Sequence, residues 1–275
     1  MIKRVLVGLA GTPYTPVAIQ RAITIAQANS AEVTGVTVLD LSHVRRLAHV
    51  QSARTRADDA RGQRLAIIES RINESICEFK EACERAKVPY QLIEEKGNPF
   101  SKLIDLARYH DLIVFGLRSI FEWEFQSGSP QELLIHLIGA GVRPIIAVSE
   151  KYRPISRVMI AYSGSMESAK AMKRFVQMNL WPEARLKIIT FNPSDDEAYK
   201  LLHAAEGYCR AHGYHVEYQP NPGQAKDLLL AAATLWQADM IVMGNSARSV
   251  WVRRILGDTL LDVLNQAEIP LFLAQ

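Results

Sequence analysis

Short runs of β-branched residues alternate with segments of helical periodicity along the first half of the chain. The runs predict five strands, at residues 5–7, 33–38, 90–94, 111–115 and 144–148. Between the first two runs, residues 16–28 place Val17, Ala22 and Ile25 on one side of a helix. A crossover helix that packs on a sheet requires such a face, so the alternation predicts a parallel sheet.

The same order of elements returns in the second half. Its strands are predicted at residues 158–161, 186–189, 215–218, 239–243 and 269–273. Turn residues recur with the strands, because Gly11-Thr12 after the first strand matches Gly164-Ser165. A repeat on this scale indicates that one structural unit occurs twice.

The repeat predicts an α/β fold of two doubly wound domains in tandem, each with a five-stranded parallel sheet. The domains are expected at residues 1–150 and 155–275, with Pro154 in the linker. The apolar fifth strands need cover on their open edges. We therefore expect strands 144–148 and 269–273 to pair with each other as an intramolecular pseudo-dimer, or with another chain in a homodimer.

The first repeat is longer than the second. From Gly11 to Gly116 the chain advances 105 residues, but from Gly164 to Gly244 it advances 80. The excess falls in residues 43–87, an Arg- and Glu-rich stretch with apolar residues at three- and four-residue steps, which predicts a lengthened helix. Two interpretations stay open: a longer crossover helix half buried on the sheet, and a lid or partner-binding helix.

Composition narrows the class of protein. Hydrophobic residues make up 48% and charged residues 22%, which excludes disordered, collagen-like and rod-like chains. The net charge of +3 comes without a dense basic tract, so neither nucleic acid nor membrane is expected as a partner. The chain shows neither an apolar run of about 20 residues nor a signal-peptide layout, and we expect a cytoplasmic protein. Cys77, Cys83 and Cys209 form no C-x-x-C pair and are predicted to be reduced structural thiols.

The loops after the first and fourth strands are the expected ligand sites, because open parallel sheets bind ligands beyond the carboxyl ends of their strands. After the fourth strand of the second half, the loop runs from Gly244 to Gly257, and a helix over residues 260–267 follows. Glycine lets backbone amides approach a phosphate, and a helix N-terminus supplies free N–H groups. The loop matches neither a Walker loop nor G-x-G-x-x-G.

At these loops the chain resembles a tandem universal stress protein, with two UspA-type domains of the adenine nucleotide alpha hydrolase-like fold. Nucleotide-binding members carry G-x2-G-x9-G-(S/T) after the fourth strand and D-G-S after the first. The corresponding loops here read Gly116-x2-Ser119-x8-Gly128-Ser129 and Gly244-x2-Ala247-x9-Gly257-Asp258.

Both copies depart from the family pattern. Ser119 and Ala247 stand in place of the middle glycine, and Asp258 stands in place of the closing hydroxyl residue. The family's aspartate after the first strand is Ala10 in one half and Ser163 in the other. A carboxylate at Asp258 would repel phosphate, although the same residue is also an ordinary N-cap for the helix that follows.

The resemblance implies a stress-response protein that binds ATP or AMP, with neither catalytic residues nor a metal site. The implied contact positions in the first half are Ala10, Gly11, Thr12, Val38, Gly116, Ser119, Gly128 and Ser129. Those in the second half are Ser163, Gly164, Gly244, Asn245, Ala247, Gly257, Asp258 and Thr259.

Two functions remain open at this point. In the first, the protein is a nucleotide-binding regulator, and the site of the first half ranks slightly higher because it keeps Gly128 and Ser129. In the second, both pockets have degenerated and the protein acts through contacts with other proteins. Slow ATP hydrolysis is a more distant alternative, because the sequence shows neither a general base nor a set of metal-binding carboxylates.

Overall fold

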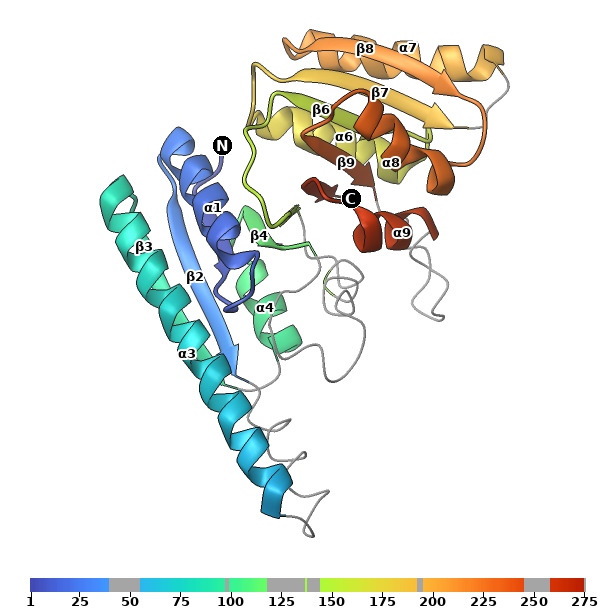
Figure 1. Ribbon diagram of the computed structural model, residues 1–275. Coiled ribbons are helices and arrows are strands. Elements are labelled where there is room, and N and C mark those ends of the chain that lie inside the picture. The colour runs from blue at the N-terminus through green and yellow to red at the C-terminus, as the bar shows by residue number, and fades with distance from the viewer. Residues whose placement is uncertain are drawn as a thin grey trace. The chain divides into compact units, whose positions relative to one another are not determined.

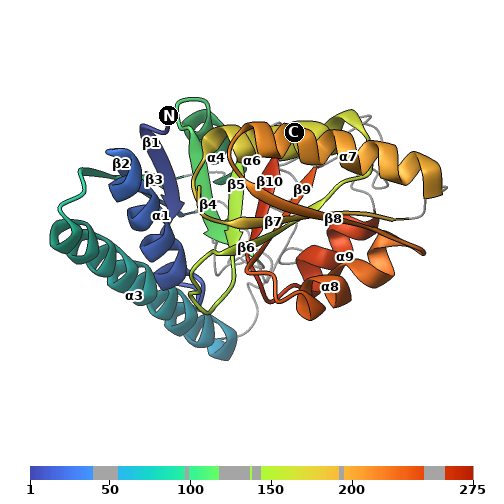
Figure 2. The ribbon, with the colours of Figure 1, turned by 90° about the horizontal axis from the view of Figure 1, so that it is seen from above.

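The computed structural model describes residues 1–39, 55–96, 99–117, 137, 144–191, 195–244 and 258–274. It divides into two compact units, Ile2–Ala140 and Gly141–Gln275, which are described in turn (Figure 1, Figure 2). Among the described residues, no helix is both long and apolar enough to cross a membrane.

The first unit is built on a parallel sheet with the strand order β3-β2-β1-β4. Its strands are β1 (Arg4–Gly8), β2 (Glu32–Leu39), β3 (Tyr90–Lys96) and β4 (Leu112–Gly116). Its described helices are α1 (Thr15–Asn29), α3 (Thr55–Ala86) and α4 (Pro99–Ala107). β4 is buried along its whole length. The predicted parallel order of these strands and crossover helices is confirmed.

Helix α3 accounts for the extra length of the first repeat. Its Ile72, Ile76, Phe79 and Cys83 recur at three- and four-residue steps and are buried. The helix packs on α1 and β2 (Figure 1), and the Phe79 ring stands edge-on to Tyr90 with ring centroids 5.5 Å apart. The C-terminal half of α3 is therefore a crossover helix. The remainder of the predicted stretch, residues 43–54, lies outside the described residues.

The second unit contains six strands in the order β5-β10-β9-β6-β7-β8. They are β5 (Ile145–Val148), β6 (Arg157–Ala161), β7 (Arg185–Phe191), β8 (His215–Asn221), β9 (Met240–Gly244) and β10 (Leu271–Ala274). All neighbours are parallel except β5 and β10, which pair antiparallel with Ile146 opposite Phe272. This pairing of the two fifth strands is the one that their apolar edges predict.

Four described helices accompany this sheet: α6 (Met166–Met178), α7 (Asp195–Ala211), α8 (Ala225–Leu235) and α9 (Asp258–Gln266). The core centres on Phe175 of α6, which is fully buried and meets the Phe272 ring edge-on at 5.3 Å. Helix α6 ends where Asn179 adopts a left-handed conformation, with φ at 48°. Figures 1 and 2 show α7 on one side of β7 and β8, and α8 on the other.

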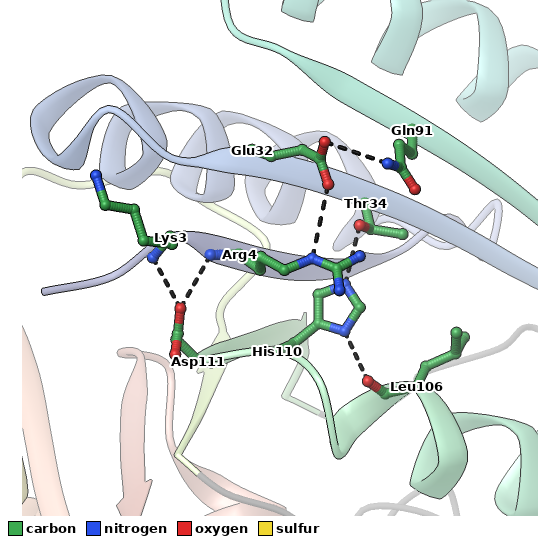
Figure 3. Close-up of polar contacts among 8 residues, drawn as sticks. All are labelled: Lys3, Arg4, Glu32, Thr34, Gln91, Leu106, His110 and Asp111. Atoms are coloured by element: carbon green, nitrogen blue, oxygen red, sulfur yellow. Dashed lines mark hydrogen bonds and ion pairs between the residues drawn. The ribbon is translucent and has the colours of Figure 1, made fainter.

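An aspartate ties β1 to β4 in the first unit, and another ties β6 to β9 in the second. The Asp111 carboxylate accepts hydrogen bonds from the N–H groups of Lys3 (2.7 Å) and Arg4 (3.0 Å), as Figure 3 shows. In the second unit, Asp239 accepts from the N–H groups of Ser156 (2.9 Å) and Arg157 (2.8 Å). The two units thus share a polar contact as well as a strand order.

The three cysteines are unbridged. Burial raises the pKa of Cys209 to about 12, and burial together with Glu84 does the same for Cys83. Both are therefore neutral thiols inside the core, as predicted, while Cys77 is exposed.

Candidate functional site

A cavity of about 380 Å³ opens at the carboxyl ends of the strands in the second unit. Ala161, Phe191 and Gly244, which end β6, β7 and β9, all line it. Gly223, just beyond the end of β8, completes this side. Ligands of open parallel α/β sheets bind at this edge.

Three helices begin at the cavity. Ser165 caps α6, Gln224 precedes α8, and Thr259 lies in the first turn of α9; all three residues are among those that line the space. The first N–H groups of a helix have no partner within the helix, and the helix dipole makes that end positive. Gln224 makes no side-chain capping bond. The three helix starts favour an anion in the cavity, against the charge of Glu167, an acid in the first turn of α6 that also lines it.

Three serine hydroxyls lie together at the start of α6. The Ser163 hydroxyl donates to the hydroxyl of Ser165 at 3.0 Å, which accepts in turn from the Ser168 N–H at 3.2 Å. The Ser168 hydroxyl donates to the Ser165 carbonyl at 2.9 Å. Hydroxyls both donate and accept, so this wall of the cavity offers polar partners of either kind.

Tyr162 is also among the residues that line the cavity. Burial raises the pKa of Tyr162 above its usual value, and Cys209 adds to the shift. The phenol is protonated at neutral pH and can donate a hydrogen bond.

Gly244 is required by packing. A Cβ at this position would lie 2.5 Å from the carbonyl oxygen of Glu167 and 2.7 Å from the Ser168 nitrogen. These are backbone atoms of α6, which the end of β9 approaches directly. The absence of a side chain at Gly244 thus brings α6 and its positive end to the cavity.

The cavity brings together some of the predicted second-half residues. Ser163, Gly244 and Thr259 line it. Gly164 lies in the same turn as Ser163, with φ at +77°, and an added Cβ there would meet the Leu201 side chain at 2.9 Å. Asp258 begins α9, but its side chain lies outside the described part of the structure.

The predicted first-half residues lie in the other unit. Ala10 and Val38 are buried, and Gly116 ends β4. The Thr12 N–H donates to the Thr15 hydroxyl at 3.1 Å, so this loop closes on itself.

Gly11 of that loop has φ at +65° and faces α3. A Cβ there would lie 2.8 Å from the Arg71 Cβ and 3.0 Å from the Arg71 carbonyl carbon. The lengthened helix therefore presses its backbone against the first-half loop, whereas the equivalent Gly164 meets only the flexible side chain of Leu201.

Several predicted positions fall outside the described residues. They are Ser119, Gly128, Ser129, Asn245, Ala247 and Gly257.

The sequence interpretation missed residues that reach the cavity from other elements. Phe191 comes from the end of β7, and Gly223 and Gln224 come from the β8–α8 turn. Pro222-Gly223 is a turn signal that could have indicated the latter, since Gly223 has φ at +104°. Within the described part of the chain, no group of three or more His, Cys, Asp or Glu side chains could hold a metal ion.

The chain is similar to known proteins of one family. The model of the universal stress protein family matches residues 1–135 and 193–275. The universal stress protein Slr1230 of Synechocystis sp. PCC 6803 is 24% identical over 182 residues, which span 66% of this chain and 63% of that protein.

Solved structures share the fold along the whole chain. The crystal structure of a universal stress protein from Archaeoglobus fulgidus DSM 4304 matches 100% of this chain and 96% of its own, with 19% identity and a TM-score of 0.71. That of a putative universal stress protein from Pseudomonas aeruginosa UCBPP-PA14 matches 99% and 93%, with 14% identity and a TM-score of 0.61. The chain belongs to the universal stress protein family, as a tandem of two of its domains.

Proposed function

We propose that the protein is a stress-response regulator that binds an adenine nucleotide, ATP or AMP, in the cavity of its second unit. The observation that carries this proposal is the meeting of three helix N-termini at one cavity on the carboxyl edge of a parallel sheet. At about 380 Å³, the cavity lies within the range of small-molecule sites.

The lining divides the cavity into two kinds of surface. The starts of α6, α8 and α9 would receive the phosphates, with Ser165 and Thr259 as hydroxyl partners. Phe191, Met243 and Leu260 provide an apolar surface for the base and ribose. Ser163 stands where the family resemblance implies a carboxylate for the nucleoside end. We therefore expect phosphate capture with weak discrimination between nucleosides.

Calorimetric titration with ATP, ADP and AMP tests the proposal. Gln224→Glu adds a carboxylate at the start of α8, which favours the helix but repels a phosphate. We expect this variant to weaken ATP binding by about tenfold or more, corresponding to about 1.4 kcal/mol. Gln177→Glu is the matched control, because Gln177 is an exposed residue of α6 away from the cavity lining. No heat from any of the three nucleotides at millimolar concentration would contradict the proposal.

Two further variants separate the halves of the chain. Gly128→Val adds a bulky side chain to the first-half loop and should leave the affinity unchanged. Loss of binding in Gly128→Val, with Gln224→Glu unaffected, would move the site to the first half. Asp258→Ser should strengthen binding to the second half, because it removes a negative charge from the start of α9.

The proposed action is binding without turnover. A phosphate-release assay with ATP checks this, and steady release that Gln224→Glu abolishes would show instead that the cavity hydrolyses its ligand.

A further inference from the structure

The outer strands of the second unit, β7 and β8, have one polar face. Leu186, Ile188 and Val216 are buried on the side that packs on α7. On the opposite side, Arg185 and His215 are exposed and lie directly across from each other in the sheet. Helix α8 lies on this side of the two strands, where Ile189 is buried, whereas Arg185, His215 and Glu217 at the amino ends of the strands stay exposed.

One cavity opens on this polar side, and another lies at the amino ends of β7 and β8. The one beside α8 measures about 440 Å³ and is bounded by Leu228, Leu235 and Trp236, with Lys187 and Ile189 from the sheet. The other measures about 660 Å³, and its lining combines Arg185, His215 and Glu217 with Leu186, Val216 and the end of α7 at Arg210. Helix α8 packs on α9. We call the surface formed by Arg157, Arg185, Lys187, Leu228, Leu235 and Trp236 the open face.

The open face carries excess positive charge. Arg157 pairs in register with Arg185 on the next strand, and Lys187 lies 5.8 Å from the centre of the Trp236 ring. Arg185 has no ion-pair partner among the described residues. Glu217, the one acid among the described residues that line the two cavities, is hydrogen bonded to the Trp236 indole. Like charges placed side by side on a sheet are unfavourable unless an acidic group compensates them.

The matching face of the first unit is neutral. There Arg4, the counterpart of Arg157, lies 3.7 Å from the carboxylate of Glu32, which also accepts from Gln91 at 3.2 Å (Figure 3). Glu32 occupies the register position that Arg185 holds in the second unit. That unit's α4 packs on the same strand, β2. The fold therefore does not require a basic row here, and only the second repeat has one.

We propose that the open face binds an acidic amphipathic helix of another protein. Leu235 is 88% exposed and Leu228 is 37% exposed, so the edge of α8 offers an apolar surface against which the apolar side of such a helix can pack. Arg185, Lys187 and Arg157 then face its acidic residues. The occupant would lie beside α8, over the exposed amino ends of β7 and β8.

A protein partner fits this face better than a nucleic acid. The cavity beside α8 is walled by leucine and tryptophan, and an acid lies on the face itself. Nucleic-acid surfaces instead carry dense basic residues, and the chain as a whole has a net charge of only +3.

Fluorescence anisotropy with the full chain tests the proposal. The probe is a labelled 18-residue helix with leucine along one side and glutamate on the other, and the comparison peptides are its lysine counterpart and a scrambled sequence. We expect the acidic helix to bind about tenfold or more tightly than either, with affinity falling as salt is added. Equal binding of all three peptides, or tighter binding of a single-stranded oligonucleotide, would overturn the proposal.

Variants place the binding on the open face. Arg185→Glu installs the residue that the first repeat carries at this register, and Leu235→Ser removes the exposed apolar side chain. Each should weaken binding of the acidic helix by about tenfold, whereas Arg174→Glu, an exposed change on α6, should not. Unchanged affinity in both Arg185→Glu and Leu235→Ser would overturn the assignment. ATP titrations of the same variants should match the parent, which separates this result from the nucleotide proposal.

Discussion

Single residues set how closely the elements of each unit approach one another. Gly244 illustrates this, because its Cα lies against the backbone of α6 at Glu167 and Ser168. A loop glycine after a fourth strand suggests a role in contacting phosphate. In the structure, the same residue is already needed to seat the helix whose N-terminus reaches the cavity.

Replacing Gly244 with alanine should therefore destabilise the protein. The added methyl would lie 2.5 Å from a backbone oxygen, and we expect a loss of about 2 kcal/mol or more in the free energy of unfolding. Urea unfolding monitored by circular dichroism measures it. Gly207→Ala is the control, since nothing lies within 4 Å of its Cβ position in α7. Gly207→Ala should instead raise the free energy of unfolding by about 0.5 to 1 kcal/mol. A neutral Gly244→Ala would refute the close approach.

His110 makes the first unit sensitive to acid. Its Nδ1–H donates to the Leu106 carbonyl at 2.6 Å, and its Nε2 accepts from the Thr34 hydroxyl at 2.9 Å (Figure 3). Burial lowers the pKa of His110 below its ordinary value of 6.5, against the opposing effect of the bond to Leu106. Between the lowered pKa in the folded chain and 6.5, the unfolded chain binds more protons than the folded chain. The free energy of unfolding therefore falls as the pH falls below 6.5.

The variant His110→Gln removes this titration. The free energy of unfolding of the parent should exceed that of the variant most at about pH 7.5, and the difference should shrink towards about pH 5. Urea unfolding at several pH values measures it, with the exposed His212→Gln as the matched control. A difference that stays constant or grows on acidification would show that His110 is not held neutral by the fold.

At the scale of elements, α3 contributes a buried stripe to the first unit. Phe79 is fully buried, and its ring occupies the space that a side chain at Gly35 would fill. Packing of Phe79 against β2 explains why α3, a charge-rich helix of 32 residues, stays bound to this unit.

Phe79→Ala tests the packing of α3. We expect a loss of about 3 to 5 kcal/mol in the free energy of unfolding, because the substitution leaves a cavity between α3 and the sheet. The exposed Cys77→Ala, two positions away on the same helix, should change stability by less than about 0.5 kcal/mol. If the two variants were equally stable, the C-terminal half of α3 would not be a packed crossover helix.

At the scale of the whole molecule, local sequence signals predicted the fold more completely than they predicted the site. Buried β-branched runs such as 112–115 and 240–243 identify strands whatever surrounds them. The recurring aspartates Asp111 and Asp239 make the repeat visible because each performs the same structural task. The tandem α/β fold could therefore be predicted from the sequence.

The cavity was harder to predict because its parts come from distant segments. The loops after β6 and β9 were identified, but Phe191 and Gln224 join them only through the sheet order. The partner of Gly244, the backbone at Glu167, is likewise set by tertiary packing. The open face has a signal in the alternating pattern of β8, yet its meaning depends on which helices cover it.

The central claim, that the second-unit cavity binds an adenine nucleotide, is tested most directly by a crystal structure of the protein with ATP or AMP. The account predicts phosphate oxygens within hydrogen-bond distance of N–H groups at the starts of α6, α8 or α9, near Ser165 and Thr259. An empty cavity in crystals grown with millimolar nucleotide, or a nucleotide bound elsewhere on the chain, would contradict it.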